Sequence, residues 1–198
     1  ESLYQKQLKD LVNQQNLIAD QIDAIEDELR RQLGPGFVPP RITGFFSWPV
    51  LLTQFGGAGR ITQHYGERSY LYRGKPHNGL DIGAPVGTLV YAAADGRVMR
   101  VDNNDRNSWR KYQYGKYILI EHSNNISTLY AHLSRQLVRE GDTVKRGDII
   151  GYSGSTGYAT GPHLHLGTYL SSTLTYQVIG AAAGLVPIGV TLNPESYL

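Results

Sequence analysis

The chain has 198 residues, of which 40% are hydrophobic and 18% charged, with 23 Gly and 14 Tyr. This composition suits one domain of ordinary size with an appendage, built from short strands and tight turns rather than from a helical bundle. The net charge of +2 gives no reason to expect nucleic acid, no run of 18 apolar residues predicts a membrane span, and the absence of Cys excludes disulfides and thiolate metal sites.

Residues 1–33 predict one amphipathic helix that ends at Gly34-Pro35-Gly36. Seam residues recur at alternating spacings of four and three positions, which is the heptad pattern of a coiled coil with one polar interruption. The seam consists of Tyr4, Leu8, Leu11, Gln15, Ile18, Ile22, Ile25 and Leu29. The segment holds four Lys or Arg and seven Asp or Glu residues, so its net charge is −3 and the remainder of the chain carries +5.

A single helix with one apolar stripe is marginal in water, so we expect this stripe to be covered. Four ways of covering it are open. The helix can pair with a second copy of itself, with a helix upstream of this sequence, or with a partner protein, or it can fold over the rest of the chain with its −3 charge facing the +5. In a self-paired helix, Gln15 would help to fix the register at some cost in stability.

Residues 34–47 are rich in Pro and Gly and predict a linker, and residues 48–198 predict an antiparallel β-sheet domain. Asp95-Gly96 and Asn124-Asn125 predict hairpin turns within it. Gly, Asp, Asn and Pro separate the short candidate strands, which cover residues 60–65, 79–82, 89–93, 97–101, 117–122, 127–133, 142–144, 148–152 and 163–169.

Two pairs of polar residues share a face on two of these strands. His77 and Asp81 are four positions apart, and His163 and His165 are two apart, so each pair lies on one side of an extended segment. Two imidazoles and one carboxylate around Zn²⁺ leave the fourth tetrahedral position for water, whose pKa the metal lowers to about 7. We therefore expect a catalytic zinc site, with the remaining His acting on a proton or an oxyanion.

Three motifs carry a resemblance to a known family: HNGLD at 77–81, YAHL at 130–133 and GPHLH at 161–165. Together they resemble the lysostaphin/LytM-type zinc endopeptidases of peptidoglycan. The resemblance runs from about residue 48 to residue 198, and includes VREGDTVKRGDIIGYSGSTG and the closing NPESYL. It implies that Zn²⁺ is bound by His77, Asp81 and His165. It further implies that His163 points at the substrate or the metal-bound water with His132 beside it, and that one of these two is the general base.

The resemblance implies a zinc metalloendopeptidase that hydrolyses cross-links or stem peptides of bacterial peptidoglycan by attack of a metal-activated water. Such an enzyme would be secreted or would lie on the periplasmic or cell-wall side of the envelope. The chain has no initiator Met and no signal peptide, and we expect a processed form whose export signal would lie upstream. In this setting residues 1–33 would form a homodimer stalk, bind an envelope partner, or hold the enzyme shut.

Other residues receive secondary interpretations. The resemblance implies a tyrosine near the site, for which Tyr70 and Tyr72 are the candidates. We interpret His122 as structural, closing a strand into a turn, and His64 as a surface or packing residue. The stretches 102–115 and 171–189 look long for the family, and the first is rich in aromatic and cationic residues that could bind stem-peptide carboxylates or glycan.

A different class of function is a non-enzymatic murein hydrolase activator. EnvC-like activators resemble this order of coiled coil and LytM-type domain, but their sites lack the zinc ligands, whereas this chain keeps every residue of the set. A third interpretation arises from VREGDTVKRGDIIG, which is similar to biotinyl and lipoyl carrier domains. Those domains need a modifiable Lys at a hairpin tip, and Lys145 is not so placed. The sequence therefore favours the enzyme.

Overall fold

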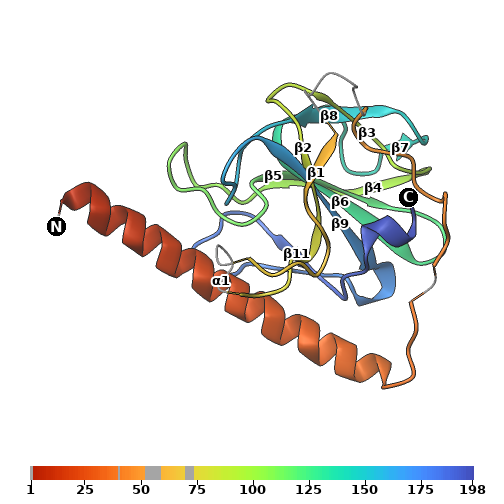
Figure 1. Cartoon of the computed structure of the whole chain (residues 1–198), viewed down its shortest axis with the longest axis horizontal. Helices are drawn as coiled ribbons and strands as arrows, with labels where there is room; N and C mark the ends of the chain where they lie inside the picture. The colour runs from red at the N-terminus through yellow and green to blue at the C-terminus, as the bar shows by residue number, and fades with distance from the viewer. Residues whose placement is uncertain (1, 40, 52–58, 70–73) are drawn as a thin grey trace.

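A long helix and a mainly antiparallel β-sheet make up the chain (Figure 1). The computed structural model describes residues 2–39, 41–51, 59–69 and 74–198. The helix is α1, Leu3–Leu33. Within the described ranges, the main sheet contains nine strands: β1 (Arg60–Gln63), β2 (Gly79–Gly83), β3 (Leu89–Tyr91), β4 (Gly96–Asn103), β5 (Lys116–Glu121), β6 (Ile126–Gln136), β7 (Thr143–Val144), β8 (Ile149–Ser153) and β9 (His163–Leu170). A separate two-stranded sheet contains β10 (Thr175–Gln177) and β11 (Val186–Ile188), and two short 3₁₀ turns cover Ser171–Thr173 and Pro194–Ser196.

The register of the sheet brings the three sequence motifs onto neighbouring strands. The strand order is β1-β2-β9-β6-β5-β4-β7, with β8 pairing to β6 and β3. Asp81 of β2 lies opposite His165 of β9. On the other side of β9, His165 lies opposite Ala131, the neighbour of His132 in β6. Strands β2, β9 and β6 therefore carry the HNGLD, GPHLH and YAHL motifs side by side.

The predicted antiparallel β domain is confirmed, and each of the nine predicted strands is present with its ends within three residues of the prediction. The turn at Asn124-Asn125 is also confirmed, because both residues have positive φ and join the paired strands β5 and β6. The hairpin predicted at Asp95-Gly96 is wrong. The strand before it, β3, pairs with β8, while β4 after it pairs with β5 and β7. A turn dipeptide reports a local bend, and it does not fix which strands pair.

Side chains pack on both faces of the sheet. Along β5, Ile118 and Ile120 belong to one buried cluster, and Leu119 between them belongs to another. Successive side chains of a strand point to opposite faces, so the two clusters lie on opposite sides of the sheet. The first cluster includes Phe46 from the predicted linker. The boundaries proposed at residues 33 and 47 stay a prediction.

The second cluster is closed by α1, which lies along the domain (Figure 1). Ile18 and Ile22 are buried there, while Tyr4 and Leu8 of the same seam are exposed. The 171–189 stretch contributes Ile179, Ala182, Val186 and Ile188 to the same cluster, so this long segment supports the helix.

Capping residues mark both the start and the end of α1. Ser2 caps the N-terminus in a capping box with Gln5, and Gly34, with φ of +82°, ends the helix as predicted. No helix in the described parts of the chain combines the length and apolarity that a membrane crossing needs. The helix is instead amphipathic, with its apolar face on the β domain.

We predict that Ile18→Ala destabilises the protein by about 2–4 kcal/mol, because it removes most of a fully buried side chain and leaves a cavity. Leu17→Ala is the matched control, since Leu17 is 55% exposed on the same helix, and it should change stability by less than about 0.5 kcal/mol. Chemical denaturation measures both variants. Equal effects would contradict the docked position of α1.

Candidate metal centre

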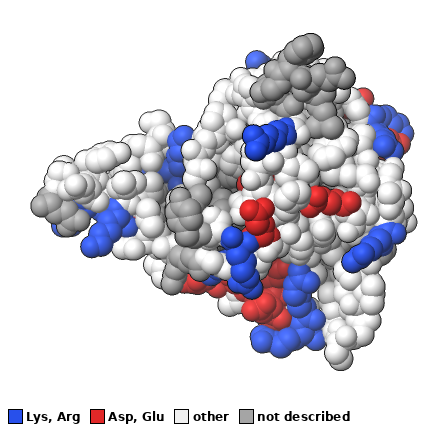
Figure 2. Space-filling view, in the orientation of Figure 1, with Lys and Arg blue, Asp and Glu red and all other residues white. Residues whose placement is uncertain are grey.

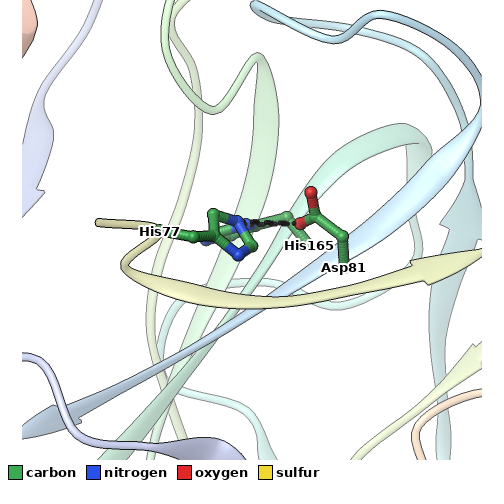
Figure 3. Close-up of side chains that lie close together, drawn as sticks. All are labelled: His77, Asp81 and His165. Carbon is green, nitrogen blue, oxygen red and sulfur yellow. Dashed lines mark hydrogen bonds and ion pairs between the residues drawn. The ribbon is translucent and has the colours of Figure 1, made fainter. Parts of the chain in front are cut away.

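The side chains of His77, Asp81 and His165 converge between two paired strands (Figure 3). His77 lies just before β2, Asp81 is in the middle of β2, and His165 is opposite Asp81 in β9. All three residues are buried, and one nitrogen or oxygen atom from each lies within 4.8 Å of the others. These three side chains form a His-Asp-His metal-binding site.

The distances show how tightly the three groups face one another. Oδ1 of Asp81 is 2.8 Å from Nδ1 of His165 and 3.2 Å from Nε2 of His77. The two imidazole nitrogens are themselves 3.2 Å apart. Two ring nitrogens and one carboxylate oxygen are a donor set that suits a divalent transition metal, so the residues present fit such an ion.

Surrounding backbone fixes which nitrogen of His77 faces the cluster. Nδ1 of His77 lies 3.2 Å from the carbonyl oxygen of His64, to which it can donate. That hydrogen bond leaves Nε2 as the nitrogen with a lone pair for a metal, as second-shell partners of ligating histidines usually do. The backbone of His77 is also held, because its N–H donates to Glu67 O and its carbonyl accepts from Gly66 N.

A glycine makes room for the His165 ring. A Cβ atom at Gly79 would lie 2.5 Å from Cε1 and 2.7 Å from Nε2 of His165, and also 2.7 Å from the carbonyl oxygen of Leu166. A side chain at position 79 would therefore push the imidazole away from Asp81. The Gly of the HNGLD motif is required by this close approach.

The electrostatics of the cluster favour the metal-binding forms of Asp81 and His165. Burial alone would raise the pKa of Asp81, but the adjacent imidazoles of His165 and His77 lower that pKa well below its ordinary value, so the carboxylate is ionised. Burial lowers the pKa of His165 and favours its neutral ring. A metal needs deprotonated ligands, and these two pKa shifts favour the deprotonated forms of Asp81 and His165.

His132 and His163 form a second pair of rings beside the cluster. Their ring centroids are 4.6 Å apart, and the His132 centroid is 5.8 Å from that of His165. Nδ1 of His132 is 2.8 Å from Thr156 O, and Nδ1 of His163 is 2.9 Å from Gly161 O. Since both Nδ1 atoms can donate to carbonyl oxygens, each ring keeps Nε2 as the nitrogen that can accept a proton.

Each of these two histidines has a feature of its own. Nε2 of His163 is buried, has no hydrogen-bond partner among the described residues, and lies 3.6 Å from Oδ2 of Asp81. His132 has a φ of +60°, an uncommon value for a residue other than Gly, next to an irregularity in the pairing of β6 with β8. Burial, with the nearby His163 and His165 rings, holds the pKa of His132 well below its ordinary value.

Several residues outside the predicted set surround the centre. Tyr114 lies 5.8 Å from His165 between ring centroids, and its hydroxyl bonds to the hydroxyl of Tyr169 and to the amide of Asn78. Tyr114 belongs to the 102–115 stretch that the sequence marked for its aromatic and cationic residues, whereas Asn78 and Tyr169 were not predicted to lie near the site. Asp105 accepts from the backbone N–H of Gly157, next to the Thr156 carbonyl that holds His132.

The other predicted residues have these positions. His122 is buried, and its two ring nitrogens lie within hydrogen-bond distance of Asp95 O and Thr128 Oγ1, in line with a structural role. The His64 side chain is 58% exposed and lies beside Glu195. Tyr70 and Tyr72 lie outside the described residues. In the 102–115 stretch, Arg106 and Lys111 donate to backbone carbonyl oxygens, of Ala181 and Ser155 respectively.

A pocket in front of the metal-binding site has walls from both parts of the chain. The β domain contributes three of the five site residues, together with Lys75 and Tyr114, and α1 contributes the opposite wall. The helix residues in this wall are Gln15, Asn16, Ala19, Ile22 and Asp23, and the site residues are His77, His132 and His165. The helix thus forms part of the wall of a pocket that also contains His77, His132 and His165.

Comparison with known proteins identifies the family. The sequence model of peptidase family M23 matches residues 75–176, which is more than half of the chain and includes all five candidate site residues. The chain therefore belongs to peptidase family M23.

Individual relatives agree with this assignment. The chain is 47% identical over 90 residues to peptidoglycan DD-endopeptidase ShyA of Vibrio cholerae, a match that covers 46% of this chain and 19% of ShyA. The catalytic domain of the prophage-encoded M23 protein EnpA from Enterococcus faecalis, solved as a mutant, has a TM-score of 0.54 at 32% identity, covering 73% of this chain and 95% of that one. A zinc-containing peptidase from Vibrio cholerae has a TM-score of 0.52 at 31% identity, covering 67% of this chain and 38% of that one. The chain thus spans about a fifth of the length of ShyA.

We predict that Gly79→Ala loses most of its bound metal and is less stable than the natural protein, because the added methyl group would overlap the His165 ring and the Leu166 carbonyl oxygen. Gly36→Ala is the control, since a Cβ there meets no atom within 4 Å. Elemental analysis of the two purified variants measures the metal, and circular dichroism checks the fold. A Gly79→Ala protein with full metal occupancy would show that metal binding does not require His165 in its present position.

Proposed function

We propose that this chain is a zinc-dependent endopeptidase that hydrolyses peptide cross-links or stem peptides of bacterial peptidoglycan. The observation that carries the proposal is the buried His77–Asp81–His165 donor set with two further imidazoles, of His132 and His163, beside it. Membership of family M23 supports the reaction, and the name of ShyA supports the substrate and favours cleavage of DD cross-links. The zinc-containing relative supports the choice of metal.

In this proposal Zn²⁺ is held by His77 Nε2, one oxygen of Asp81 and His165 Nδ1. When bound, Zn²⁺ would lower the pKa of a water molecule to about 7 and would polarise the carbonyl group of the substrate. The chain's own contribution is to hold these three donors in place by the contacts of Gly79 and of the His64 carbonyl.

His132 and His163 would move the protons of the reaction. Each has Nδ1 against a backbone carbonyl oxygen, so Nε2 can accept a proton from the attacking water and pass it to the leaving amine. The lowered pKa of His132 keeps that ring neutral before the reaction, which is the state a general base needs. The rings are close enough to act as a pair, and either can take the first proton.

The proposed site of action is the cell envelope or the medium outside it, where peptidoglycan is found. A murein hydrolase activator without enzymatic activity has less support, because such a protein has no need of a complete donor set with ionised Asp81. Any protein partner, a second copy of the chain or another envelope protein, would bind through α1.

The proposal is tested by digesting purified peptidoglycan with zinc-loaded protein and identifying the products by mass spectrometry. We expect newly released peptide ends, and loss of activity when a chelator removes the metal. Products that lack such ends at full zinc occupancy would contradict the proposal.

We predict that His132→Ala keeps its zinc and loses hydrolysis by about 10² to 10⁴-fold, because it removes a proton-transfer group and leaves the three metal ligands intact. Leu137→Ala, an exposed residue just after β6, is the control and should have the activity of the natural sequence. Initial rates on peptidoglycan and elemental analysis are measured for both variants. Near-normal turnover by His132→Ala would remove His132 from the mechanism.

A further inference from the structure

Lys75 lines the pocket beside the metal-binding site. It is two residues before His77 and lines the same pocket as His77, His132 and His165. Its side chain is 26% exposed, and its ammonium group faces α1. In a pocket with a buried metal-binding site, this Lys is the cation nearest in sequence to the ligands and can bind an anionic group of a substrate.

The helix already supplies anionic groups to this ammonium. Nζ of Lys75 is 2.6 Å from Oδ1 of Asp20 and 2.6 Å from Oδ2 of Asp23. The two Asp side chains are about half exposed, so both ion pairs are partly open to solvent. Figure 2 shows acidic and basic side chains next to one another over the C-terminal half of α1, which is consistent with pairing along the helix rather than a face of one sign.

Other contacts fix the register in which α1 presents these carboxylates. The side-chain amide of Gln15 donates to Oε1 of Gln113 at 2.7 Å, and Oε1 of Gln15 accepts from the backbone N–H of Gln113 at 3.0 Å. At the other end, Glu26 accepts from the backbone N–H of Thr191. Gln15 is therefore the polar seam residue that aligns the helix on the β domain, with buried Ile18 beside it.

We propose that Lys75 is a carboxylate-binding residue of the substrate cleft, and that Asp20 and Asp23 of α1 occupy it while the helix is docked. This inference rests on the proposed function, because the carboxylate would belong to a peptidoglycan peptide. Stem peptides carry free carboxylates, and such a group would take the place of the helix side chains on Lys75.

Replacement of Asp20 and Asp23 by a substrate carboxylate on Lys75 can be reversible. Ion pairs between partly exposed side chains are weak, so a substrate carboxylate can displace Asp20 and Asp23. The contacts of Gln15 and Ile18 on one side of this ion pair and of Glu26 on the other are separate from it, so α1 stays attached while the turn at residues 20–23 loosens. Lys75 thus gives specificity for acidic peptides, and the helix competes with them for the same ammonium.

The first test compares two soluble substrates: a cross-linked stem-peptide dimer with free carboxylates, and the same dimer with those carboxylates converted to carboxamides. The natural protein should prefer the free acid severalfold in kcat/KM, since the carboxamide still accepts a hydrogen bond but has lost the charge that pairs with Lys75. Lys75→Gln should bring the ratio near one, mainly through KM. An unchanged ratio in Lys75→Gln overturns the inference while the proposed function stands.

The helix is tested with the double variant Asp20→Asn/Asp23→Asn. It frees Lys75, so KM for the free-acid dimer should fall severalfold. The matched control is Asp10→Asn/Asp27→Asn, which makes the same charge change at exposed positions of the same helix and should leave KM as it was. Equal KM values for the two double variants overturn the competition between helix and substrate.

Hydrogen exchange gives a readout that does not need turnover. The free-acid dimer should raise amide exchange around residues 20–23 in zinc-loaded His132→Ala protein, and the carboxamide dimer should not. The Asp20→Asn/Asp23→Asn protein should show the raised exchange without any peptide. If the free-acid dimer does not change exchange in α1, the inference about Lys75 is wrong, whatever the activity. If exchange rises but the natural protein hydrolyses no peptide, the inference about Lys75 stands and the endopeptidase proposal is rejected.

Discussion

The ionised carboxylate of Asp81 is the constraint around which the site is organised. A buried charge is costly unless it is paired, and here the partners are the imidazoles of His77 and His165. The pairing of β2 with β9 puts Asp81 directly opposite His165, so a slip of one residue in register would turn one of the two side chains to the other face of the sheet. The apolar residues on that other face, Leu80, Leu164 and Leu166, hold the register because they are fully buried.

Backbone carbonyl oxygens around the cluster orient its imidazole rings by hydrogen bonds. The His64 carbonyl orients His77, and the Thr156 and Gly161 carbonyls orient the two histidines beside the cluster. Thr156 is in turn held by the hydrogen bond from its hydroxyl to Leu133 O, and the adjacent Gly157 N–H is bound by Asp105. Loops that are distant in sequence thus set the direction of each imidazole, and the uncommon φ of His132 is tolerated within this network.

The strands were predicted well from the sequence because turn residues bound each short strand. Within each strand, successive side chains point to opposite faces of the sheet. The same-face pairs His77/Asp81 and His163/His165 were also readable, since side-chain direction follows from spacing alone. The placement of α1 was not readable, because a seam from Leu11 to Leu29 looks the same whether its partner is another helix or a sheet. Gln15, which would fix register in a coiled coil, instead pairs with Gln113, a contact 98 positions away in sequence. Strands β10 and β11 were missed because they are three residues long and separated by a Gly- and Ala-rich stretch.

We propose that His77, Asp81 and His165 hold one zinc ion and that His132 and His163 stand outside its coordination. Anomalous diffraction at the zinc absorption edge, from crystals of the zinc-loaded protein, tests this directly. The account predicts one peak per chain, within about 2.0–2.2 Å of a nitrogen of each of the two ligand histidines and an oxygen of Asp81. A peak bound by His132 or His163 in place of one of these three, or no peak at the cluster, would contradict it.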